Sequence, residues 1–515
     1  MGETRADAAG IAPRDEQRHD DDVIVTDAAA DVEVAVRLAA ASGFERSSRA
    51  DRARWLTALA EALDAHRDEL VALAAEETRL SPARLTGEVT RTATQLRFFA
   101  GVALEGSYVE ATLDAPDASL TPPRPDLRRM LRPLGVVAVF AASNFPFAFS
   151  VLGGDTASAL AAGCPVVVKA HPGHPRLSRR VVEIARASLT DAGSPSSALA
   201  LVDGFEAGTA LVRHPLVSAV GFTGSTRGGR ALFDLASARP APIPFYGELG
   251  SINPVVVTPD AAADVAAIAA GLAGSFTRDG GQYCTKPGLV FVPEGSGFEA
   301  ALVAALADAP SQALLTDGIA SAFDSGSAGL SARDDVEVVF AGERATDAAA
   351  PVVIATTVEG FVAAHEAFLE ECFGPLTLLV RYPAEGSAAP GAPLADALGG
   401  SLVAALAVLE GSLTGTIHHA PGEDVVELTE ALARVAGRVV YNGWPTGVAI
   451  AWAQHHGGGW PATTASVHTS VGATAIRRWL TPIAYQDAPA AVLPPELTDG
   501  NPLGIPRRED GVLVA

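Results

Sequence analysis

The sequence predicts an α/β protein that contains two doubly wound parallel-sheet domains. Its 515 residues are too many for one ordinary hydrophobic core. Between residues 134 and 237, short apolar runs alternate with segments of helical pattern, and strands separated by helices in this way form parallel sheets. A second region with the same character extends from residue 253 to residue 478.

The segment before residue 134 is predicted to be a polar tail followed by helices. Residues 1–22 lack the apolar core of a signal peptide, so we expect a flexible tail there. Leucines then repeat at helical spacing, at Leu56, Leu59, Leu63, Leu70 and Leu73. Ser81 followed by Pro82 predicts a further helix start, with serine as the N-cap and proline in the first turn.

Each sheet region divides into predicted strands and helices. The first has strands at 134–140, 165–168, 198–202 and 217–222, and helices near 153–162, 176–192, 206–213 and 226–237. The second has strands at 254–257, 288–292 and 376–381, and a helix at 394–409 that Gly399-Gly400 would interrupt. Residues 325–329 and 384–393 have the composition of loops.

These patterns also predict domain boundaries. Residues 23–118 and 134–249 are assigned to the first sheet domain, and residues 250–479 to the second. The segment 119–133, rich in proline and arginine, and the proline-rich tail 480–507 fit neither sheet. They are therefore expected to form a separate small unit.

Charge and cysteine content restrict the possible partners. The 37 basic and 60 acidic residues give a net charge of −23, which argues against nucleic acid and anionic membranes. The uncharged stretch 133–154 has Ser143-Asn144-Phe145-Pro146 at its centre, so a buried strand, a loop and a helix start are expected instead of a membrane span. Three cysteines without metal-like spacing predict a reducing, cytoplasmic location and no metal site.

Cys284 is the candidate nucleophile. It lies in Gly281-Gln282-Tyr283-Cys284-Thr285, where glycine removes side chains from the approach to the thiol. Glu248 precedes it by 36 residues and is the candidate general base. The alternatives are a buried structural cysteine and a solvated glutamate.

Asn144 is the candidate oxyanion donor. It follows the first predicted strand of the sheet, where its side-chain amide and the Cys284 backbone N–H would stabilise the oxygen that becomes negative when a thiolate attacks a carbonyl. The alternative is an asparagine that closes a turn before Pro146.

These motifs occur in one order along the chain: Asn144, Lys169, Glu248-Leu249-Gly250, Cys284 and Glu371-Cys372-Phe373-Gly374-Pro375. In that order the chain resembles the aldehyde dehydrogenase superfamily, from about residue 25 to its C-terminus. The resemblance implies oxidation of an aldehyde to an acid by NAD or NADP, through a thiohemiacetal and a thioester on Cys284. Glu248 would activate water, and its presence disfavours a CoA-acylating enzyme.

The resemblance also implies a cofactor site. Lys169 would contact the adenosine ribose, Gly224 and Ser225 the pyrophosphate, and Glu371 the other ribose, with Phe373 beside the nicotinamide. Many NAD-preferring relatives carry a glutamate three residues after the lysine, where this chain has Pro172. NADP is therefore slightly favoured over NAD. His171 or His174 would assist its binding, unless both are ordinary surface residues.

In the same family, segments like 119–133 and 480–507 form a β arm that makes oligomer contacts. The resemblance therefore implies a β oligomerisation arm with a C-terminal tail. A homodimer or a homotetramer is expected, with a small-molecule aldehyde as the other partner.

The substrate is indicated by the most distinctive motifs. Ser251 and the segments 442–448, 455–463 and 501–507 look like those of 2-oxoglutarate semialdehyde (2,5-dioxopentanoate) dehydrogenases. Arg278, six residues before the nucleophile, is the candidate for binding the distal carboxylate of such a substrate, the alternative being an ion pair with Asp279.

Trp444 and Pro445 are predicted to line the substrate funnel, with core packing as the alternative. An apolar funnel would favour a fatty aldehyde, and the Arg278 position also matches succinate semialdehyde dehydrogenases. A catalytically inactive dehydrogenase fold that serves as a binding protein is the alternative from another class.

Overall fold

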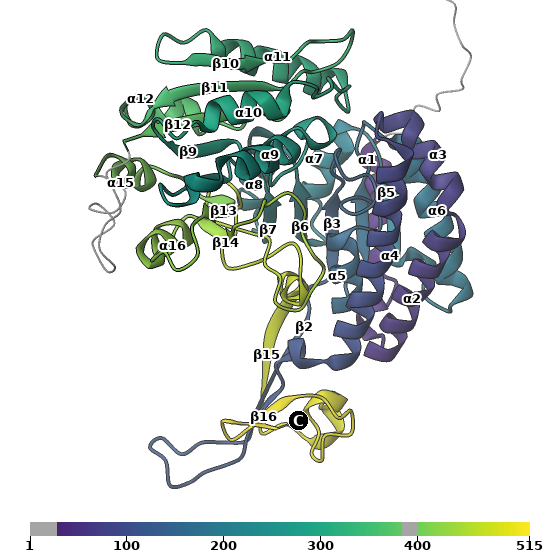
Figure 1. Cartoon of the computed structure of the whole chain (residues 1–515). Helices are drawn as coiled ribbons and strands as arrows, with labels where there is room; N and C mark the ends of the chain where they lie inside the picture. Colours follow the sequence, from purple (N-terminus) through teal and green to yellow (C-terminus); the bar gives the residue numbers. More distant parts are fainter. Residues whose placement is uncertain (1–27, 384–399, 515) are drawn as a thin grey trace, which may run out of the picture.

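A computed structural model describes residues 28–383 and 400–514 (Figure 1). Within these residues the chain forms two sheet-centred bodies and a third, smaller sheet that projects from them. The predicted α/β architecture is confirmed. The predicted tail 1–22 and the predicted loop 384–393 lie outside the described residues, as do residues 394–399 of the predicted helix.

The first body begins with four helices, α1 (Ala28–Ala40), α2 (Arg49–Ala65), α3 (Arg67–Thr78) and α4 (Pro82–Glu105). The predicted helical leucines are confirmed, and α2 packs along α4. Ser81 accepts a hydrogen bond from the backbone N–H of Arg84, which makes it the N-cap of α4. One end of α4 is thereby fixed beside the candidate site.

The first sheet has the order β5-β4-β3-β6-β7, and every neighbouring pair is parallel. Its strands are β3 (Val136–Phe140), β4 (Val166–Lys169), β5 (Leu199–Val202), β6 (Val217–Thr223) and β7 (Phe245–Glu248). The connecting helices are α5 (Gly154–Ala162), α6 (Pro175–Asp191), α7 (Phe205–Arg213) and α8 (Thr226–Ser237). Four strands and four helices were predicted to within about two residues, while β7 was not predicted.

The second sheet has the order β10-β11-β12-β9-β8-β13-β14, in which only β10 runs antiparallel to its neighbour. Its strands are β8 (Pro254–Val257), β9 (Leu289–Pro293), β10 (Glu337–Ala341), β11 (Val352–Thr357), β12 (Leu376–Tyr382), β13 (Ser412–His418) and β14 (Ala436–Tyr441). Its helices are α9 (Val265–Phe276), α10 (Phe298–Leu306), α11 (Asp317–Ser331), α12 (Val358–Ala363), α13 (His365–Phe368), α15 (Gly400–Ala407) and α16 (Val426–Ala433).

One loop prediction in this body is wrong. Residues 325–329 belong to α11, although two of the five are glycine. Thr316 caps the helix by accepting a hydrogen bond from the N–H of Ile319, and the buried side chain of Phe323 packs against Gly374. Capping and packing outweigh the cost of about 1 kcal/mol that each glycine imposes on a helix.

The projecting sheet, which we call the arm, has the order β15-β2-β1-β16-β17 (Figure 1). It joins β1 (Thr112–Asp114) and β2 (Leu127–Pro133) to β15 (Leu480–Gln486), β16 (Arg507–Glu509) and β17 (Val512–Val514). The segments 119–133 and 480–507 therefore lie together, and the sheet also takes in residues 112–114 and 512–514.

Short 3-10 turns complete the described chain, at Phe44–Arg46, Ser107–Val109, Ser196–Ala198, Ala261–Asp264, Arg278–Gly281, Ala473–Trp479, Ala490–Val492 and Pro495–Leu497. The uncharged stretch forms β3, a loop and the start of α5, as predicted. Among the described helices, none combines the length and the apolar character needed to cross a bilayer.

Candidate active site

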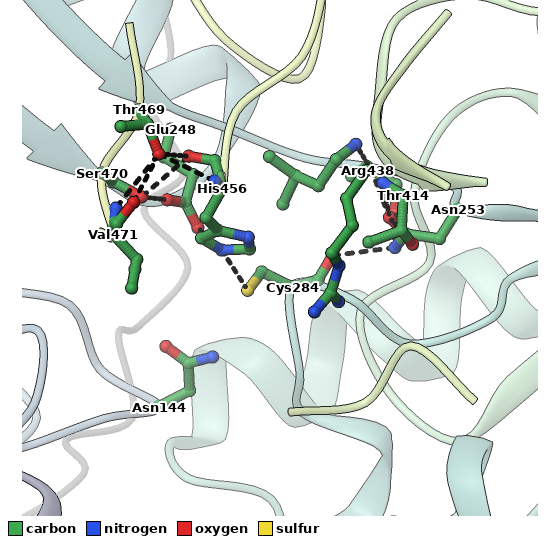
Figure 2. Close-up of polar contacts among 12 residues, drawn as sticks. Asn144, Glu248, Asn253, Cys284, Thr414, Arg438, His456, Thr469, Ser470 and Val471 are labelled. Carbon is green, nitrogen blue, oxygen red and sulfur yellow. Dashed lines mark hydrogen bonds and ion pairs between the residues drawn. The ribbon is translucent and has the colours of Figure 1, made fainter. Parts of the chain in front are cut away.

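Three reactive side chains meet where the two bodies face each other. The Cys284 Sγ lies 3.5 Å from Nε2 of His456, and the same nitrogen lies 2.9 Å from Oε1 of Glu248. Figure 2 shows the three side chains turned toward one another, with Asn144 beyond the thiol. Glu248 ends β7 of the first sheet, whereas Cys284 and His456 lie in loops of the second part of the chain. The cluster therefore depends on how the two bodies are packed.

Hydrogen bonds fix the carboxylate and the imidazole. Ser470 donates to Oε2 of Glu248 over 2.5 Å, so both carboxylate oxygens have a partner. The hydroxyl of Thr469 accepts from the backbone N–H of His456 at 2.7 Å and donates to the carbonyl of Val471 at 2.7 Å. His456 and Glu248 are both buried, so the pair is held away from bulk water.

Asn253 holds the nucleophile segment against the second sheet. Its amide donates to the carbonyl of Cys284 at 2.8 Å (Figure 2). It also donates to the carbonyl of Lys286 at 3.0 Å. Its side-chain oxygen accepts from the backbone N–H of Thr414 and from the hydroxyl of Ser251. Asn253 has a φ of 54°, in the left-handed region that asparagine tolerates better than most residues. It acts as a positioning residue for Cys284.

The electrostatics keep the resting nucleophile protonated. Burial, together with the charge of Glu248 and a hydrogen bond to it, raises the pKa of the Cys284 thiol well above its usual value, and Arg91 opposes this shift. Burial also raises the pKa of Glu248, but interactions with His456 and Ser470 outweigh burial and leave that pKa below its ordinary value. An ionised carboxylate thus lies beside a neutral thiol, which is the arrangement a base needs before it removes a proton.

Asn144 reaches the same segment from the first sheet. Its Nδ2 donates to the carbonyl of Gln282 over 3.0 Å, two residues before the nucleophile. An asparagine amide has two N–H donors, so one remains for a second acceptor. The backbone of Asn144 is held by Arg84, whose Nη2 donates to its carbonyl over 2.7 Å.

A cavity of about 490 Å³ opens onto the thiol. Its walls come from α4, the loop after β3, the nucleophile segment and the loop that carries Gly447, Val448 and His456. On α4, Arg84, Glu88 and Arg91 recur at helical spacing and line the cavity together. Two of these three side chains are cationic and Glu88 pairs with Arg84 over 3.8 Å, which leaves the charge of Arg91 to favour an anion on that wall.

Arg84 is fully engaged in this wall. It forms an ion pair with Asp279 over 2.8 Å, and its guanidinium lies 4.7 Å from the Phe145 ring and 4.9 Å from the Tyr283 ring. The same Asp279 carboxylate accepts from the Tyr283 hydroxyl over 2.5 Å. Arg84 therefore connects α4 to both loops that flank the nucleophile.

Arg91 differs from Arg84. Its Nε and Nη2 are buried and have no hydrogen-bond partner among the described residues. Burial lowers the pKa of Arg91, although the charges of Glu88, Cys284 and Glu248 oppose that shift. A buried guanidinium without partners is costly, and pairing with a carboxylate offsets that cost.

The three predicted substrate residues do not all lie in the cavity wall. Arg278 is exposed at the cavity rim, 5.8 Å above the Tyr283 ring, while Asp279 pairs with Arg84 instead. The proposed Arg278–Asp279 ion pair is therefore not formed. Trp444 does not line the cavity, because it packs against Gly271 and lies 4.6 Å from the His418 ring.

Pro445 is likewise absent from the cavity wall. It is buried, and its carbonyl accepts a hydrogen bond from Arg438 over 2.8 Å. Two residues further on, Gly447 has a φ of 111°, a backbone conformation that favours glycine, and it turns the chain toward the cavity. The core-packing alternative thus describes Trp444 and Pro445, and the following residues form the wall.

The predicted cofactor residues lie along one edge. Lys169 ends β4, and Gly224 and Ser225 follow β6, at the carboxyl end of the first sheet, where such sheets bind ligands. Ser225 N-caps α8 by accepting from the N–H of Gly228. A Cβ atom on Gly250 would lie 2.9 Å from Oε2 of Glu371, so these two segments approach closely.

Glu371 and Phe373 belong to a loop that touches the nucleophile segment. A Cβ atom on Gly281 would lie 2.5 Å from the carbonyl oxygen of Gly374. Lys286 donates to the carbonyls of Cys372 and Leu376 and thereby holds this loop in place. The charge of Glu371 raises the pKa of Cys284, so the cofactor edge and the thiol are adjacent.

Comparison with known proteins identifies the family. The model of the aldehyde dehydrogenase family matches residues 17–389. The chain belongs to the aldehyde dehydrogenase family. The predicted resemblance is therefore confirmed, and the enzyme is an oxidoreductase that acts on aldehydes with NAD(P).

Two relatives extend over most of the enzyme. "Alpha-ketoglutaric semialdehyde dehydrogenase 2" of Azospirillum brasilense is 45% identical over 94% of this chain and 92% of its own length. "Alpha-ketoglutaric semialdehyde dehydrogenase" of Acinetobacter baylyi is 38% identical over 91% of this chain and 88% of its own length.

Solved structures agree with the fold. An NAD-dependent aldehyde dehydrogenase from Sinorhizobium meliloti superimposes with a TM-score of 0.73 at 24% identity, over 90% of this chain and 88% of the other. A putative aldehyde dehydrogenase from Burkholderia cenocepacia gives the same TM-score at 24% identity, over 89% and 92% of the two chains. At this identity the match concerns the fold alone.

The residues along the cofactor edge fit NAD(P). Oε1 of Glu371 is buried without a partner among the described residues, so it is free to accept from ribose hydroxyls. The two histidines near Lys169 are not surface cations. His174 is buried and bonds to the Ala142 carbonyl, and burial lowers the pKa of His171 to about 3. At this part of the cofactor edge, Lys169 supplies the positive charge and the two histidines do not.

Sequence reasoning missed three residues of this site. His456 lies 172 residues after Cys284, and its only signal was a distinctive His-His-Gly-Gly-Gly run. Asn253 stood in a motif that was noted only for Ser251. Arg91 gave no signal, because an arginine on an amphipathic helix usually faces solvent.

Proposed function

We propose that the enzyme oxidises 2-oxoglutarate semialdehyde to 2-oxoglutarate. The observation that carries this proposal is at Arg91, in the cavity that opens onto Cys284: its Nε and Nη2 are buried and have no hydrogen-bond partner among the described residues. A semialdehyde of a dicarboxylic acid brings one carboxylate into the cavity at a distance from its aldehyde. Arg91 pairs with that carboxylate, and both relatives described above carry the corresponding substrate in their names.

The chemistry starts with the thiol. Glu248, ionised and bonded to His456, takes the proton of Cys284 as the thiolate attacks the aldehyde carbon. The second N–H of the Asn144 amide and the Cys284 backbone N–H donate to the oxygen that becomes negative, forming a thiohemiacetal. When bound, NAD(P) would supply the hydride acceptor. Loss of the hydride from the thiohemiacetal carbon converts the adduct on Cys284 into a thioester.

Hydrolysis uses the same base. Glu248 first releases the thiol proton to solvent and then removes a proton from the attacking water, while Ser470 and His456 keep its carboxylate aimed at the sulfur. Glu248 returns that proton to the Cys284 thiolate when the acid leaves. His456 also lies 3.5 Å from the sulfur, so it stabilises charge on the departing thiolate. We expect Glu248→Gln to slow thioester hydrolysis more than acyl transfer, so the acylated enzyme accumulates and is visible by intact mass.

We propose NADP as the preferred cofactor. Pro172 leaves no carboxylate three residues after Lys169, so a 2′-phosphate meets no repulsion there. Lys169 supplies a cation there: burial lowers its pKa, the charge of Asp203 opposes that shift, and no acid among the described residues is hydrogen-bonded to it. Lys169 then binds the phosphate as a compact positive charge.

We further propose that the arm mediates a homodimer or homotetramer. Val512 and Leu513 of β17 are exposed apolar residues on a sheet edge, which a second chain would cover. A cytoplasmic location is supported by the three cysteines, all of which are free thiols.

The test compares kcat/KM for 2-oxoglutarate semialdehyde, succinate semialdehyde and a long-chain aldehyde, each with NAD and with NADP. Preference for the five-carbon semialdehyde with NADP supports both assignments. Preference for the long-chain aldehyde would reject the substrate assignment, and absence of turnover with all three would favour a binding protein.

A further inference from the structure

The nucleophile cluster contains the three ligand types that zinc prefers. Sγ of Cys284, Nε2 of His456 and a carboxylate oxygen of Glu248 all lie within 4.8 Å of one another. Zinc in proteins is bound by thiolate, imidazole and carboxylate in tetrahedral geometry. We propose that these three side chains form an inhibitory binding site for a thiophilic divalent cation such as Zn²⁺.

One of the three ligand separations matches a tetrahedral site and a second is close to it, while Sγ and the carboxylate oxygen lie within 4.8 Å of each other. Zinc–sulfur bonds of about 2.3 Å and zinc–nitrogen bonds of about 2.05 Å place sulfur and nitrogen about 3.6 Å apart. The observed separation of Sγ and Nε2 is 3.5 Å. Nitrogen and oxygen ligands lie about 3.4 Å apart in the same geometry. The observed 2.9 Å between Nε2 and Oε1 requires a side-chain shift of about half an ångström.

The cluster also has an open side. Cys284 and His456 both line the cavity, so an ion can enter from there, and water can complete the fourth position. The protein supplies three ligands and leaves one place free, which is the coordination that distinguishes an accessible zinc site from a closed structural one.

Binding the cation requires two proton shifts. The metal replaces the thiol proton of Cys284, which is released to solvent. Nε2 of His456, which donates toward Glu248, must give up its proton, and Nδ1 must carry one. The Nε2 contact with Glu248 favours the present tautomer and is replaced by the bond to the metal, while Nδ1, which has no hydrogen-bond partner among the described residues, takes the proton without losing a contact.

Charge nearby modulates the affinity. A thiolate and a carboxylate together neutralise a divalent cation, and Glu371 adds a further negative charge close to the sulfur. Arg91 opposes binding, since its charge acts on both Cys284 and Glu248.

A cation bound by these three side chains would inhibit the enzyme. A cation that holds the nucleophile and the base removes both from the reaction. Zn²⁺ is therefore expected to inhibit the enzyme reversibly, competitively with aldehyde, and a chelator is expected to restore activity. Mg²⁺ is expected to have no such effect, because it prefers oxygen ligands in octahedral geometry.

The test uses the full-length, reduced, metal-free enzyme without substrate or cofactor, titrated with Co²⁺ under argon. We expect one equivalent per chain, with the cobalt–thiolate charge-transfer absorption of a tetrahedral site and its loss on addition of Zn²⁺. Cys284→Ser should abolish the band, and His456→Gln should weaken binding by at least about tenfold. The matched control is Cys164→Ser, a buried cysteine whose sulfur bonds to the Trp479 carbonyl and which should leave the band unchanged.

A second measurement needs no variant. Zn²⁺ should slow alkylation of Cys284 in the wild-type chain, as read by peptide mass spectrometry, and EDTA should restore the rate. A cobalt–thiolate band that persists in Cys284→Ser, or alkylation of Cys284 at the same rate with and without Zn²⁺, would overturn the site. Catalysis by the metal-free enzyme does not depend on this outcome, so failure here leaves the proposed reaction standing.

Discussion

Two arginines on the same face of α4 line the same cavity and differ in what surrounds them. Arg84 has an acid partner, a backbone carbonyl and two aromatic rings. Arg91, two helical turns later, has two buried nitrogens without a partner among the described residues. A guanidinium whose bonds are all made within the chain stabilises the structure. One that is buried without them is left for a ligand, and this contrast assigns different roles to two residues of one type.

The largest expected effect is at Arg91. Arg91→Met removes the charge and retains most of the length, so kcat/KM for 2-oxoglutarate semialdehyde should fall by about 100-fold or more, as expected when one partner of a buried charge pair is removed. Turnover of an uncharged aldehyde should stay within about threefold, because such a substrate has no carboxylate to pair with residue 91. Equal losses for both substrates would show that Arg91 acts structurally, like Arg84.

Arg84→Met should destabilise the enzyme and slow all aldehydes alike. The guanidinium is nearly buried and its loss leaves Asp279 uncompensated, so the free energy of unfolding should fall by about 2–4 kcal/mol. Denaturant unfolding measures the first effect and a two-substrate assay the second. A loss confined to the charged substrate would assign carboxylate recognition to Arg84.

Glu371 is expected to make the KM for the cofactor depend on pH, an effect of intermediate size. Burial raises the pKa of Glu371 to about 7, against the opposing charge of Lys286. The ionised form is the better acceptor for ribose hydroxyls and exists above that pKa, so KM for the cofactor should rise as pH falls below 7, by up to about tenfold per pH unit. In Glu371→Gln the KM should be higher and nearly independent of pH. A wild-type KM that is flat between pH 6 and 8 would contradict this role.

Arg278→Ala should have the smallest effect. Its side chain is exposed at the rim, so it attracts a carboxylate through water instead of pairing with it in the cavity. We expect kcat/KM for the semialdehyde to fall by about twofold, and the difference should disappear in high salt because exposed charges are screened. A loss as large as that of Arg91→Met would restore Arg278 as the residue that binds the substrate carboxylate.

The fold was largely predictable from the sequence because four of the five strands of the first sheet carry largely apolar runs, whereas β7, with the sequence Phe-Tyr-Gly-Glu, does not. The strands β3, β4, β5 and β6 were predicted to within two residues. The segment 325–329 was misread because its glycines suggested a loop. The Thr316 cap and the packing of Phe323 against Gly374 are tertiary facts that composition does not carry.

The sequence predicted the site residues only where neighbouring residues in the chain form a recognisable motif. Cys284, Glu248 and Asn144 are each marked by their neighbours, whereas His456 reaches the thiol from 172 residues away. Trp444 was placed in the funnel because it is large and lies in a distinctive motif. The direction of its side chain depends on packing against Gly271 and His418, which no spacing rule reveals.

The role of Arg91 in binding the substrate carboxylate is tested most directly by a thermodynamic cycle. The cycle removes the positive charge from the arginine, the carboxylate from the substrate, and then both. We would measure kcat/KM of wild type, Arg91→Met, Arg84→Met and Arg278→Ala with 2-oxoglutarate semialdehyde and with an uncharged five-carbon aldehyde. We predict a coupling energy of at least about 2 kcal/mol between the substrate carboxylate and Arg91, and values near zero for the other two arginines. A coupling energy below about 0.5 kcal/mol at Arg91 would contradict its role in binding the substrate carboxylate.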